Sequence, residues 1–366
     1  MIRIGITGAD GFLGWHLRIF LRPAQNISLV MADRETFADP KKLREFAGSV
    51  DAIAHLAGAN RGDDRLVRDT NVALAKQLVA ACESAGARPH IVFANSTHHT
   101  RTTMYGEAKR MAAKTLAAWA AKAQAPFTNL VIPHIFGEGG RPHYNSAVAT
   151  FCHQIANGEK PRIIKDGELE LIHAQRVAEE ISAAINRRQG GETRLRGTSI
   201  HVSAVLSVLQ SMAQQYAAQV IPEFPSLLAL DLFNNYRWYL FPQRYPIDLK
   251  LRFDQCGTMF DAVKTLHGGQ CMLSITGPAI TRGDHYHRRK LERVLVLQGE
   301  ALIRIRRLLD DDITEFRVSG ARPQFVDMPT LHTHSITNTG AGNLTTLFWT
   351  QEISDDRNPD TYSEKI

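Results

Sequence analysis

Three histidines and one glutamate in the last quarter of the chain could bind a metal ion together. His285 and His287 are separated by one residue, Glu292 follows five residues later, and His334 lies in a later segment. Alternate residues of a strand project to the same side, so His285 and His287 can point together into a β domain. Three imidazoles and one carboxylate suit zinc, iron, manganese or nickel. The alternative is a polar strand face that binds nothing.

A tyrosine and a lysine in the first third of the chain form a second candidate site. Tyr105 and Lys109 are four residues apart at the start of a helical pattern, so both side chains project from one helix face. An ammonium near a phenol favours the phenolate, so we expect a lowered pKa for Tyr105 and a role in proton transfer. Ser96, nine residues earlier, can hydrogen-bond the same substrate oxygen, with Thr97 as the less favoured candidate.

A glycine-rich turn at the start of the chain has the spacing of a dinucleotide-binding turn. Gly8, Gly11 and Gly14 stand between an alternating apolar segment and a segment of helical periodicity. Glycines at these positions allow a tight turn, close approach of a pyrophosphate and close helix packing. After the second expected strand, Asp33 would bind the ribose of NAD, whereas Arg34 would bind the 2′-phosphate of NADP. The residues leave this choice open.

Alternating strands and helices must position both the glycine turn and the tyrosine. Five strands are expected, separated by segments of helical periodicity, at residues 2–7, 27–32, 52–57, 90–94 and 129–133. This alternation predicts an α/β fold of the Rossmann type, a doubly wound parallel sheet with helices on both faces.

The pattern changes from about Asn234, where an aromatic-rich segment with prolines is interpreted as a linker. Short apolar segments broken by Gly, Asp and Asn follow it and predict an all-β sandwich or barrel. A chain of 366 residues is long enough for two domains. We place them at residues 1–243, which would bind NAD(P), and 244–366, which contain the histidine cluster.

Composition and charge exclude several classes of protein. The net charge is +6, but no basic segment is interleaved with aromatic residues, so no nucleic-acid partner is expected. No signal peptide or membrane span is expected, and unpaired cysteine spacing argues against disulfides and thiolate zinc sites. These cysteines are Cys82, Cys152, Cys256 and Cys271. A cytoplasmic enzyme with an anionic substrate is therefore expected.

The first domain resembles the extended short-chain dehydrogenase/reductase family in its glycine turn and in the segments HLAG and MYGEAK. The resemblance implies that Tyr105 is the acid/base, that Lys109 also holds the nicotinamide ribose, and that Ser96 orients the carbonyl. Nucleotide-sugar dehydratases of this family have an Asp-Glu pair where this chain has His98 and His99. Dehydration is therefore disfavoured, and hydride transfer to or from a sugar ketone remains.

The second domain resembles the cupin family of jelly-roll barrels. Six residues separate Glu292 from Gly299, as in the first cupin motif. Pro329 precedes His334 by five residues and Asn338 follows it by four, as in the second motif. The resemblance implies an all-β cupin barrel in which the three histidines and the glutamate hold the metal.

The two domains in this order resemble, essentially from end to end, the CapF family of bifunctional capsular-polysaccharide enzymes. The segments concerned are GANR, MYGEAK, RPHYNSAVATFC, GPAITRGDHYH, FRVSG and NPDTY. The resemblance implies that a zinc-containing cupin domain epimerises C3 of a UDP-4-keto-6-deoxy-N-acetylhexosamine. The other domain would then reduce the C4 ketone with NADPH, to a UDP-N-acetyl-6-deoxy-L-talosamine derivative. It further implies substrate binding by Asn145 and a homodimer.

Several residues depart from these families and keep alternatives open. Asp33 is a carboxylate that the CapF family lacks, so NADH stays the alternative cofactor. Leu331 replaces the usual glycine of the second cupin motif, and His332 replaces an aromatic residue, so it is either the C3 base or an ordinary loop histidine. The alternatives for the whole chain are a reductase with a structural or dimerising cupin and a non-catalytic nucleotide sensor.

Overall fold

The computed structural model describes residues 1–188, 190–255 and 257–366. Contacts divide the chain into two units. The Rossmann unit comprises Met1–Ile135 and Leu169–Ser199, and the β unit comprises Phe136–Glu168 and Ile200–Ile366. The domain boundary between residues 243 and 244 stays a prediction. Cys256 lies outside the described residues, and the other three cysteines are free thiols.

The Rossmann unit contains a six-stranded parallel sheet in the order β2-β1-β3-β4-β5-β8. Its strands are β1 (Ile2–Thr7), β2 (Ile27–Ala32), β3 (Ala52–His55), β4 (His90–Ser96), β5 (Phe127–Ile132) and β8 (Gly191–Arg194). All five predicted strands are present, and the predicted fold class is confirmed. The strand order reverses between β1 and β3, where sheets of this kind bind ligands.

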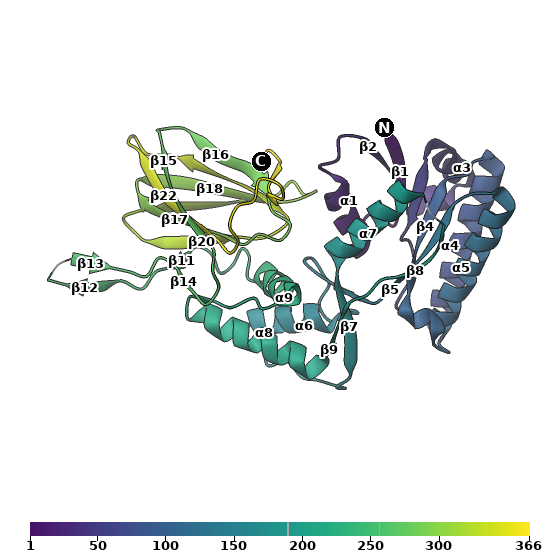
Figure 1. Ribbon diagram of the computed structural model, residues 1–366, viewed down its shortest axis with the longest axis horizontal. Coiled ribbons are helices and arrows are strands. Elements are labelled where there is room, and N and C mark those ends of the chain that lie inside the picture. The colour runs from purple at the N-terminus through teal and green to yellow at the C-terminus, as the bar shows by residue number, and fades with distance from the viewer. Residues whose placement is uncertain (189, 256) are drawn as a thin grey trace. The chain divides into compact units, whose positions relative to one another are not determined.

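Helices cover both faces of this sheet (Figure 1). One face packs against α1 (Phe12–Leu21) and α7 (Ala174–Arg187), and the other against α3 (Pro40–Ser49), α4 (Asp64–Ala85) and α5 (Met104–Ala123). Leu17 and Ile181 lie in the first core, and Phe46, Leu78 and Trp119 in the second. The central strands β1, β3, β4 and β5 are mostly apolar and buried because helices cover both sides of the sheet.

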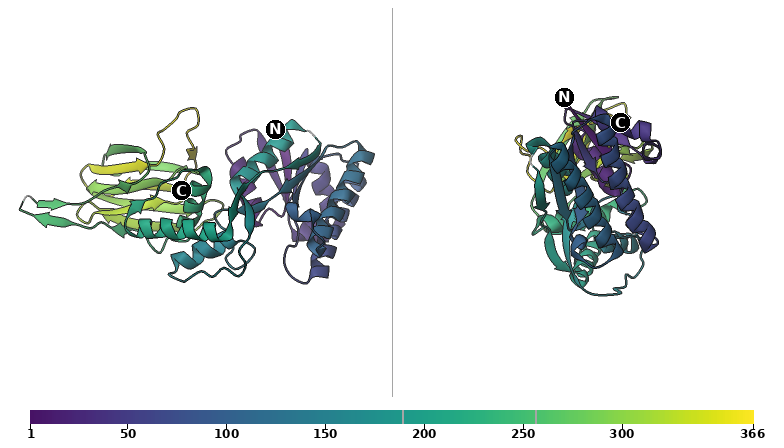
Figure 2. Two further views of the ribbon diagram at one scale, coloured as in Figure 1. Left: turned by 60° about the horizontal axis from the view of Figure 1, so that its bottom comes forward. Right: turned by 90° about the vertical axis from the view of Figure 1, so that its right-hand side faces the viewer.

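The β unit contains two five-stranded antiparallel sheets, so the predicted all-β region is confirmed. The first has the order β11 (Ile247–Asp248), β20 (Gln324–Met328), β17 (Glu292–Gln298), β22 (Leu344–Thr350) and β15 (Gln270–Thr276). The second has the order β19 (Ile313–Ser319), β18 (Glu300–Arg307), β21 (His332–Asn338), β16 (Thr281–Tyr286) and β23 (Tyr362–Ser363). A hairpin of β12 (Arg252–Asp254) and β13 (Gly257–Met259) projects from the sheets in both views (Figures 1 and 2).

The described residues of the β unit also form the helices α6 (Ala147–Ala156), α8 (Val202–Ala217) and α9 (Leu227–Trp238). The interpretation of residues from Asn234 as a linker is wrong, because Asn234 lies inside α9. Phe233 and Tyr236 of this helix are buried, so the aromatic residues are core residues.

The remaining elements are short or lie where the chain passes from one unit to the other. The short helices are α2 (Arg34–Ala38) and η1 (Thr97–Thr100). A three-stranded sheet contains β6 (His134–Phe136), β7 (Glu168–His173) and β9 (Thr198–His201), and β10 (Val220–Ile221) pairs with β14 (Lys264–Thr265). Among the described residues, no helix is long and apolar enough to cross a membrane.

Candidate active site and metal centre

The glycine turn follows β1 and leads directly into α1. Gly8 has a φ of +71°, and a Cβ built on it would lie 2.8 Å from the backbone nitrogen of Ala57. A Cβ on Gly14 would lie 2.2 Å from the Gly8 carbonyl oxygen, so only glycine fits either position. Gly11 is the N-cap of α1 and has no side chain to cap the helix. The turn therefore fits a pyrophosphate held by the backbone at the end of a parallel strand.

Asp33 and Arg34 lie at the end of β2, as predicted, but their roles differ. Asp33 is the N-cap of α2. Its Oδ1 accepts hydrogen bonds from the backbone nitrogen of Thr36 at 2.8 Å and from the hydroxyl of Thr36 at 2.7 Å. These bonds lower the pKa of Asp33. Arg34 is exposed at the first position of the helix. One Asp33 oxygen is thus used in the helix cap, while the guanidinium of Arg34 faces solvent.

The structure brings Ser96, Tyr105 and Lys109 together. Ser96 ends β4, and Tyr105 and Lys109 are one turn apart at the start of α5. Ser96 lies close enough to Tyr105 for its hydroxyl to lower the Tyr105 pKa. The Lys109 Nζ lies 5.9 Å from the centre of the Tyr105 ring and donates to the Ala94 carbonyl at 2.8 Å. A hydroxyl, a phenol and an ammonium at the carboxyl end of β4 can orient and protonate a carbonyl oxygen.

Burial shifts the pKa values of both titratable groups at this site. It lowers the pKa of Lys109 to about 8, because the ammonium is enclosed by protein. Burial also raises the pKa of Tyr105, and the nearby Ser96 hydroxyl offsets this only in part. The expected lowering of the Tyr105 pKa is therefore wrong for this structure. The free-energy cost of burying a phenolate outweighs the attraction of the phenolate to the Lys109 ammonium, which points to the Ala94 carbonyl.

Two histidines occupy the place of the acidic pair found in dehydratases. The ring of His98 meets that of Tyr105 edge to face, with 6.3 Å between ring centres, and burial lowers the His98 pKa. His99 lies 3.4 Å from the Asn95 amide nitrogen. His134 is also near: its Nε2 is buried without a hydrogen-bond partner among the described residues, and its pKa is lowered by burial and by His98.

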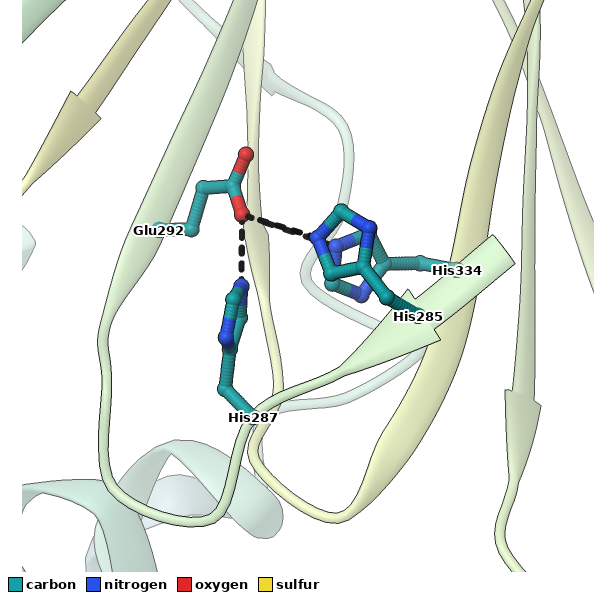
Figure 3. A group of neighbouring side chains, drawn as sticks. All are labelled: His285, His287, Glu292 and His334. Carbon is teal, nitrogen blue, oxygen red and sulfur yellow. Dashed lines mark hydrogen bonds and ion pairs between the residues drawn. The ribbon is translucent and has the colours of Figure 1, made fainter. Parts of the chain in front are cut away.

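The predicted metal ligands converge inside the β unit (Figure 3). His285 on β16 pairs with His334 on β21, Glu292 begins β17 of the opposite sheet, and His287 lies in the turn between β16 and β17. The Glu292 Oε2 is 2.8 Å from the Nε2 of His287, 3.5 Å from that of His334 and 3.8 Å from that of His285. One atom from each residue lies within 4.8 Å of the others, so a single ion could contact all four.

The chemistry of this cluster fits a divalent cation. Burial alone would raise the pKa of Glu292, but the contacts with the three imidazoles hold it well below its ordinary value. Burial also lowers the pKa of His334, whose Nε2 has no hydrogen-bond partner in the described part of the chain. A buried carboxylate beside an imidazole nitrogen that lacks a partner is the arrangement expected of metal ligands.

A cavity of about 460 Å³ opens beside the cluster. His285, Glu292 and His334 line it. Apolar side chains form most of the remaining wall, with Ser274, Arg282 and Ser335 as further polar residues. The apolar residues are Met272, Leu273, Ile275, Val294, Met328, Ile336 and Phe348. This volume is within the range of small-molecule binding sites.

Asp360, near the end of the chain, orients the cluster and was missed in the sequence. Its backbone carbonyl is 2.7 Å from the Nδ1 of His287. A carbonyl only accepts, so Nδ1 donates and Nε2 is left to bind a cation. The Asp360 carboxylate accepts from the backbone nitrogens of Arg289 at 2.9 Å and Lys290 at 2.8 Å. In the sequence, the segment NPDTY that contains Asp360 indicates only the family resemblance.

Two backbone features near the metal ligands include a departure from the cupin motifs, at Leu331. Strand β16 contains a bulge between Gly283 and His285, with Asp284 at a φ of 55°. Leu331, in place of the usual glycine, has a φ of 60° and is fully buried. Its backbone nitrogen donates to the His287 carbonyl at 2.8 Å. Leu331 thus keeps the conformation that glycine favours, at a cost of about 1–2 kcal/mol.

His332 and Asn145 lie apart from the cluster. His332 begins β21, so it is not a loop histidine, and the described residues that line the 460 Å³ cavity do not include it. Burial lowers its pKa to about 4. These observations do not favour His332 as the C3 base. Asn145 is exposed and immediately precedes Ser146, the N-cap of α6.

The fold and the first site define a class of protein. Residues 4–195, more than half of the chain, match the NAD dependent epimerase/dehydratase family, and the chain belongs to this family. Residues 252–362 match the Polysaccharide biosynthesis C-terminal domain.

Particular relatives cover the chain from end to end. A Pseudomonas aeruginosa protein named UDP-2-acetamido-2,6-beta-L-arabino-hexul-4-ose reductase is 29% identical over 99% of this chain and 98% of its own. The crystal structure of the capsular polysaccharide assembling protein CapF from Staphylococcus aureus is 28% identical with a TM-score of 0.64, over 100% of both chains. The resemblance to the CapF family is thereby confirmed. RMD from P. aeruginosa in complex with NADPH, 18% identical with a TM-score of 0.54 over 58% of this chain and 84% of its own, shares the fold alone.

Proposed function

We propose that this protein is a bifunctional nucleotide-sugar enzyme of capsule or O-antigen polysaccharide biosynthesis. Its β unit would epimerise C3 of a UDP-4-keto-6-deoxy-N-acetylhexosamine, and its Rossmann unit would reduce the C4 ketone to a UDP-N-acetyl-6-deoxy-L-talosamine type of product. The observation that supports this best is the pairing, in one chain, of a Ser96, Tyr105 and Lys109 site with a histidine-lined cavity. The name of the P. aeruginosa relative supports the reductase part of this proposal, and the name of the S. aureus relative supports the link to capsular polysaccharide.

Reduction requires a proton at the ketone oxygen and a hydride at C4, which NADPH would supply. Tyr105 would donate its phenolic proton to the sugar O4, and Ser96 would hydrogen-bond the same oxygen. The charge that develops on the Tyr105 oxygen is stabilised by the Lys109 ammonium, which the Ala94 carbonyl holds in place. The products are a C4 alcohol and the oxidised cofactor, with the proton of Tyr105 restored from solvent.

Epimerisation uses the same ketone in a different way. A carbonyl at C4 acidifies the proton on C3, so a base can remove that proton and an acid can return one to the opposite face. His285, Glu292 and His334 line the cavity where this exchange would occur, and its apolar side chains would pack against the sugar ring. A zinc ion held by these residues and His287 would supply positive charge to polarise oxygen or would hold the sheets together.

The proposed preference for NADPH follows from the two residues at the end of β2, Asp33 and Arg34. Asp33 uses one carboxylate oxygen in the cap of α2, which weakens it as a ligand for the ribose hydroxyls of NADH. Arg34 is exposed beside it and can pair with a 2′-phosphate. We therefore favour NADPH, with NADH as the alternative, and expect Arg34→Ala to raise the KM for NADPH about 10-fold or more with little effect on NADH.

A homodimer is the proposed assembly, and edge strand β15 supports it. Its outward residues Leu273 and Ile275 are 68% and 66% exposed, and Cys271 lies on the same face. Exposed apolar residues on an edge strand invite pairing with another chain. A second copy of this chain, with the same apolar edge, is the partner that this surface fits.

One experiment tests the proposed reactions together. The protein is incubated with UDP-4-keto-6-deoxy-N-acetylhexosamine in deuterated water, with and without NADPH, and C3 and C4 are followed by NMR. We expect deuterium at C3 without cofactor, and a C4 alcohol only when NADPH is added. Reduction without any C3 exchange would instead support the single-activity reductase.

A further inference from the structure

A second cavity, of about 220 Å³, lies in the β unit and has no lining residue in common with the larger one. Its wall combines two aromatic rings, a buried histidine, a guanidinium and two carboxylates. The lining residues are Trp238, Phe241, Ile305, Arg307, Asp310, Asp312, Thr314 and His332. Nothing in the two proposed reactions uses this cavity.

His332 forms a hydrogen-bonding wall of this cavity. Only 4% of the residue is exposed, and its Nδ1 is 2.9 Å from the Thr330 carbonyl. That nitrogen must donate, because a carbonyl only accepts, so Nε2 of the neutral ring is an acceptor. Nε2 makes no hydrogen bond to any described residue, although it belongs to a side chain that lines the cavity. An imidazole nitrogen on a cavity wall can accept a hydrogen bond from a ligand or from water.

The orientation of His332 is fixed by hydrogen bonds of the residues next to it. The Thr330 hydroxyl donates to the Glu138 carboxylate at 2.7 Å, and both residues are buried. Glu138 and Thr330 thus anchor the backbone carbonyl that holds the imidazole. Such support is typical of a ligand site, because a fixed acceptor loses little entropy when it binds.

Aromatic rings flank the same imidazole. The centre of the His332 ring is 4.9 Å from that of Trp238 and 5.1 Å from that of Phe241. Arg307 pairs with His332 across strands β18 and β21, and its guanidinium carbon lies 5.3 Å from the Trp238 ring. The cavity therefore offers apolar ring faces, hydrogen-bond acceptors and one cationic donor within a small space.

We propose that this cavity binds a single neutral sugar ring. The C–H face of a pyranose packs on aromatic rings, while its hydroxyls can donate to His332 and Asp312 and accept from Arg307. Asp310 and Asp312 oppose a phosphate or carboxylate ligand by charge repulsion. The volume of about 220 Å³ is below that of typical drug-sized sites, so it suits one ring rather than a whole nucleotide sugar.

Ligand-observed saturation-transfer NMR on the full-length protein tests this proposal. The probes are free N-acetylglucosamine, N-acetylgalactosamine and fucose, which contain no nucleotide. We expect saturation transfer to the ring C–H protons of at least one probe. His332→Phe keeps an aromatic ring but removes the acceptor, and Asp312→Asn removes one charge at an exposed position; each should weaken binding about 10-fold.

Two controls separate this cavity from the larger one. His285→Ala alters only the wall of the larger cavity, so it should leave the transfer unchanged. Inorganic phosphate should not displace the sugar, and circular dichroism should show that each variant is folded. The proposal would be overturned if no probe received transfer, or if transfer persisted in both His332→Phe and Asp312→Asn. It would also be overturned if transfer were lost in His285→Ala or if phosphate displaced the sugar.

Discussion

Lys109 and Tyr105 show how burial sets the chemistry of individual residues. The pKa of the buried Lys109 ammonium is lowered to about 8, whereas burial raises the pKa of Tyr105. Tyr105 therefore holds its proton firmly and is suited to donate it to a ketone once the product oxygen becomes basic. Lys109 is charged below about pH 8 and can stabilise the phenolate left behind.

The lowered Lys109 pKa predicts a pH dependence for reduction. Lys109 loses its charge as the pH rises through about 8, so kcat/KM for the ketone should fall above this pH. In Lys109→Arg, which stays charged throughout, this fall should be absent, even if the overall rate is lower. NADPH oxidation measured between pH 6 and pH 10 would show the difference. A fall at the same pH in both proteins would assign it to another group.

At the metal centre, the prediction concerns His287. Its Nδ1 donates to the Asp360 carbonyl, so Nε2, which lies 2.8 Å from the Glu292 carboxylate, is the nitrogen that would bind the ion. We expect His287→Ala to lower zinc affinity at least about 100-fold, because loss of even a supporting residue of a metal ligand costs 10- to 100-fold. Elemental analysis after dialysis would measure this. His267→Ala, a histidine of the same unit outside the cluster, should keep its metal; equal zinc in both variants would contradict the assignment.

At the scale of elements, a buried ionic network joins helix α8 to strands β17 and β20. Arg293 and Asp327 form a fully buried pair with contacts of 2.7 and 2.9 Å, and Tyr216 of α8 donates to the same carboxylate. The guanidinium of Arg293 also lies 3.6 Å from the centre of the Phe325 ring. These bonds hold one helix against the sheet that contains Glu292.

Breaking this network should destabilise the protein far more than breaking a surface pair. In Asp327→Asn the Arg293 charge stays buried without its counter-ion, so we expect the free energy of unfolding to fall by about 3–5 kcal/mol. The matched control is Arg322→Gln, which removes an exposed pair with Asp248 and should cost about 0–1 kcal/mol. Urea denaturation followed by circular dichroism compares the two. Similar losses for both variants would refute the role given to the buried pair.

Local patterns predicted some elements well and could not predict others. The glycine turn and the Tyr105 to Lys109 spacing depend on neighbours in sequence, and the structure places both as expected. Helix α9 was misread because its aromatic residues are buried by partners distant in sequence. The same reason hid Asp360, which acts on His287 from 73 residues away. The position of His332 depends on how the two sheets close, which no short pattern specifies.

At the scale of the whole molecule, the apolar edge of β15 predicts the state of assembly. Leu273→Glu and Ile275→Glu together place charge on this edge, so we expect the double variant to sediment as a monomer and the unaltered protein as a dimer. Analytical ultracentrifugation at several concentrations measures this. Leu266→Glu, an exposed apolar residue outside β15, is the control and should remain dimeric. A monomeric unaltered protein would contradict the proposed assembly.

Both proposed reactions depend on one ketone, which is used first to exchange the C3 proton and then to accept hydride. The most direct test is NMR of the sugar in deuterated water with two variants, Tyr105→Phe and His287→Ala. Tyr105→Phe should still incorporate deuterium at C3 but lose reduction by about 100-fold or more. His287→Ala should lose C3 exchange yet still oxidise NADPH with the C3-epimerised ketone. Normal C3 exchange in His287→Ala, or loss of both reactions in Tyr105→Phe, would contradict the assignment of the two reactions to two separate sites.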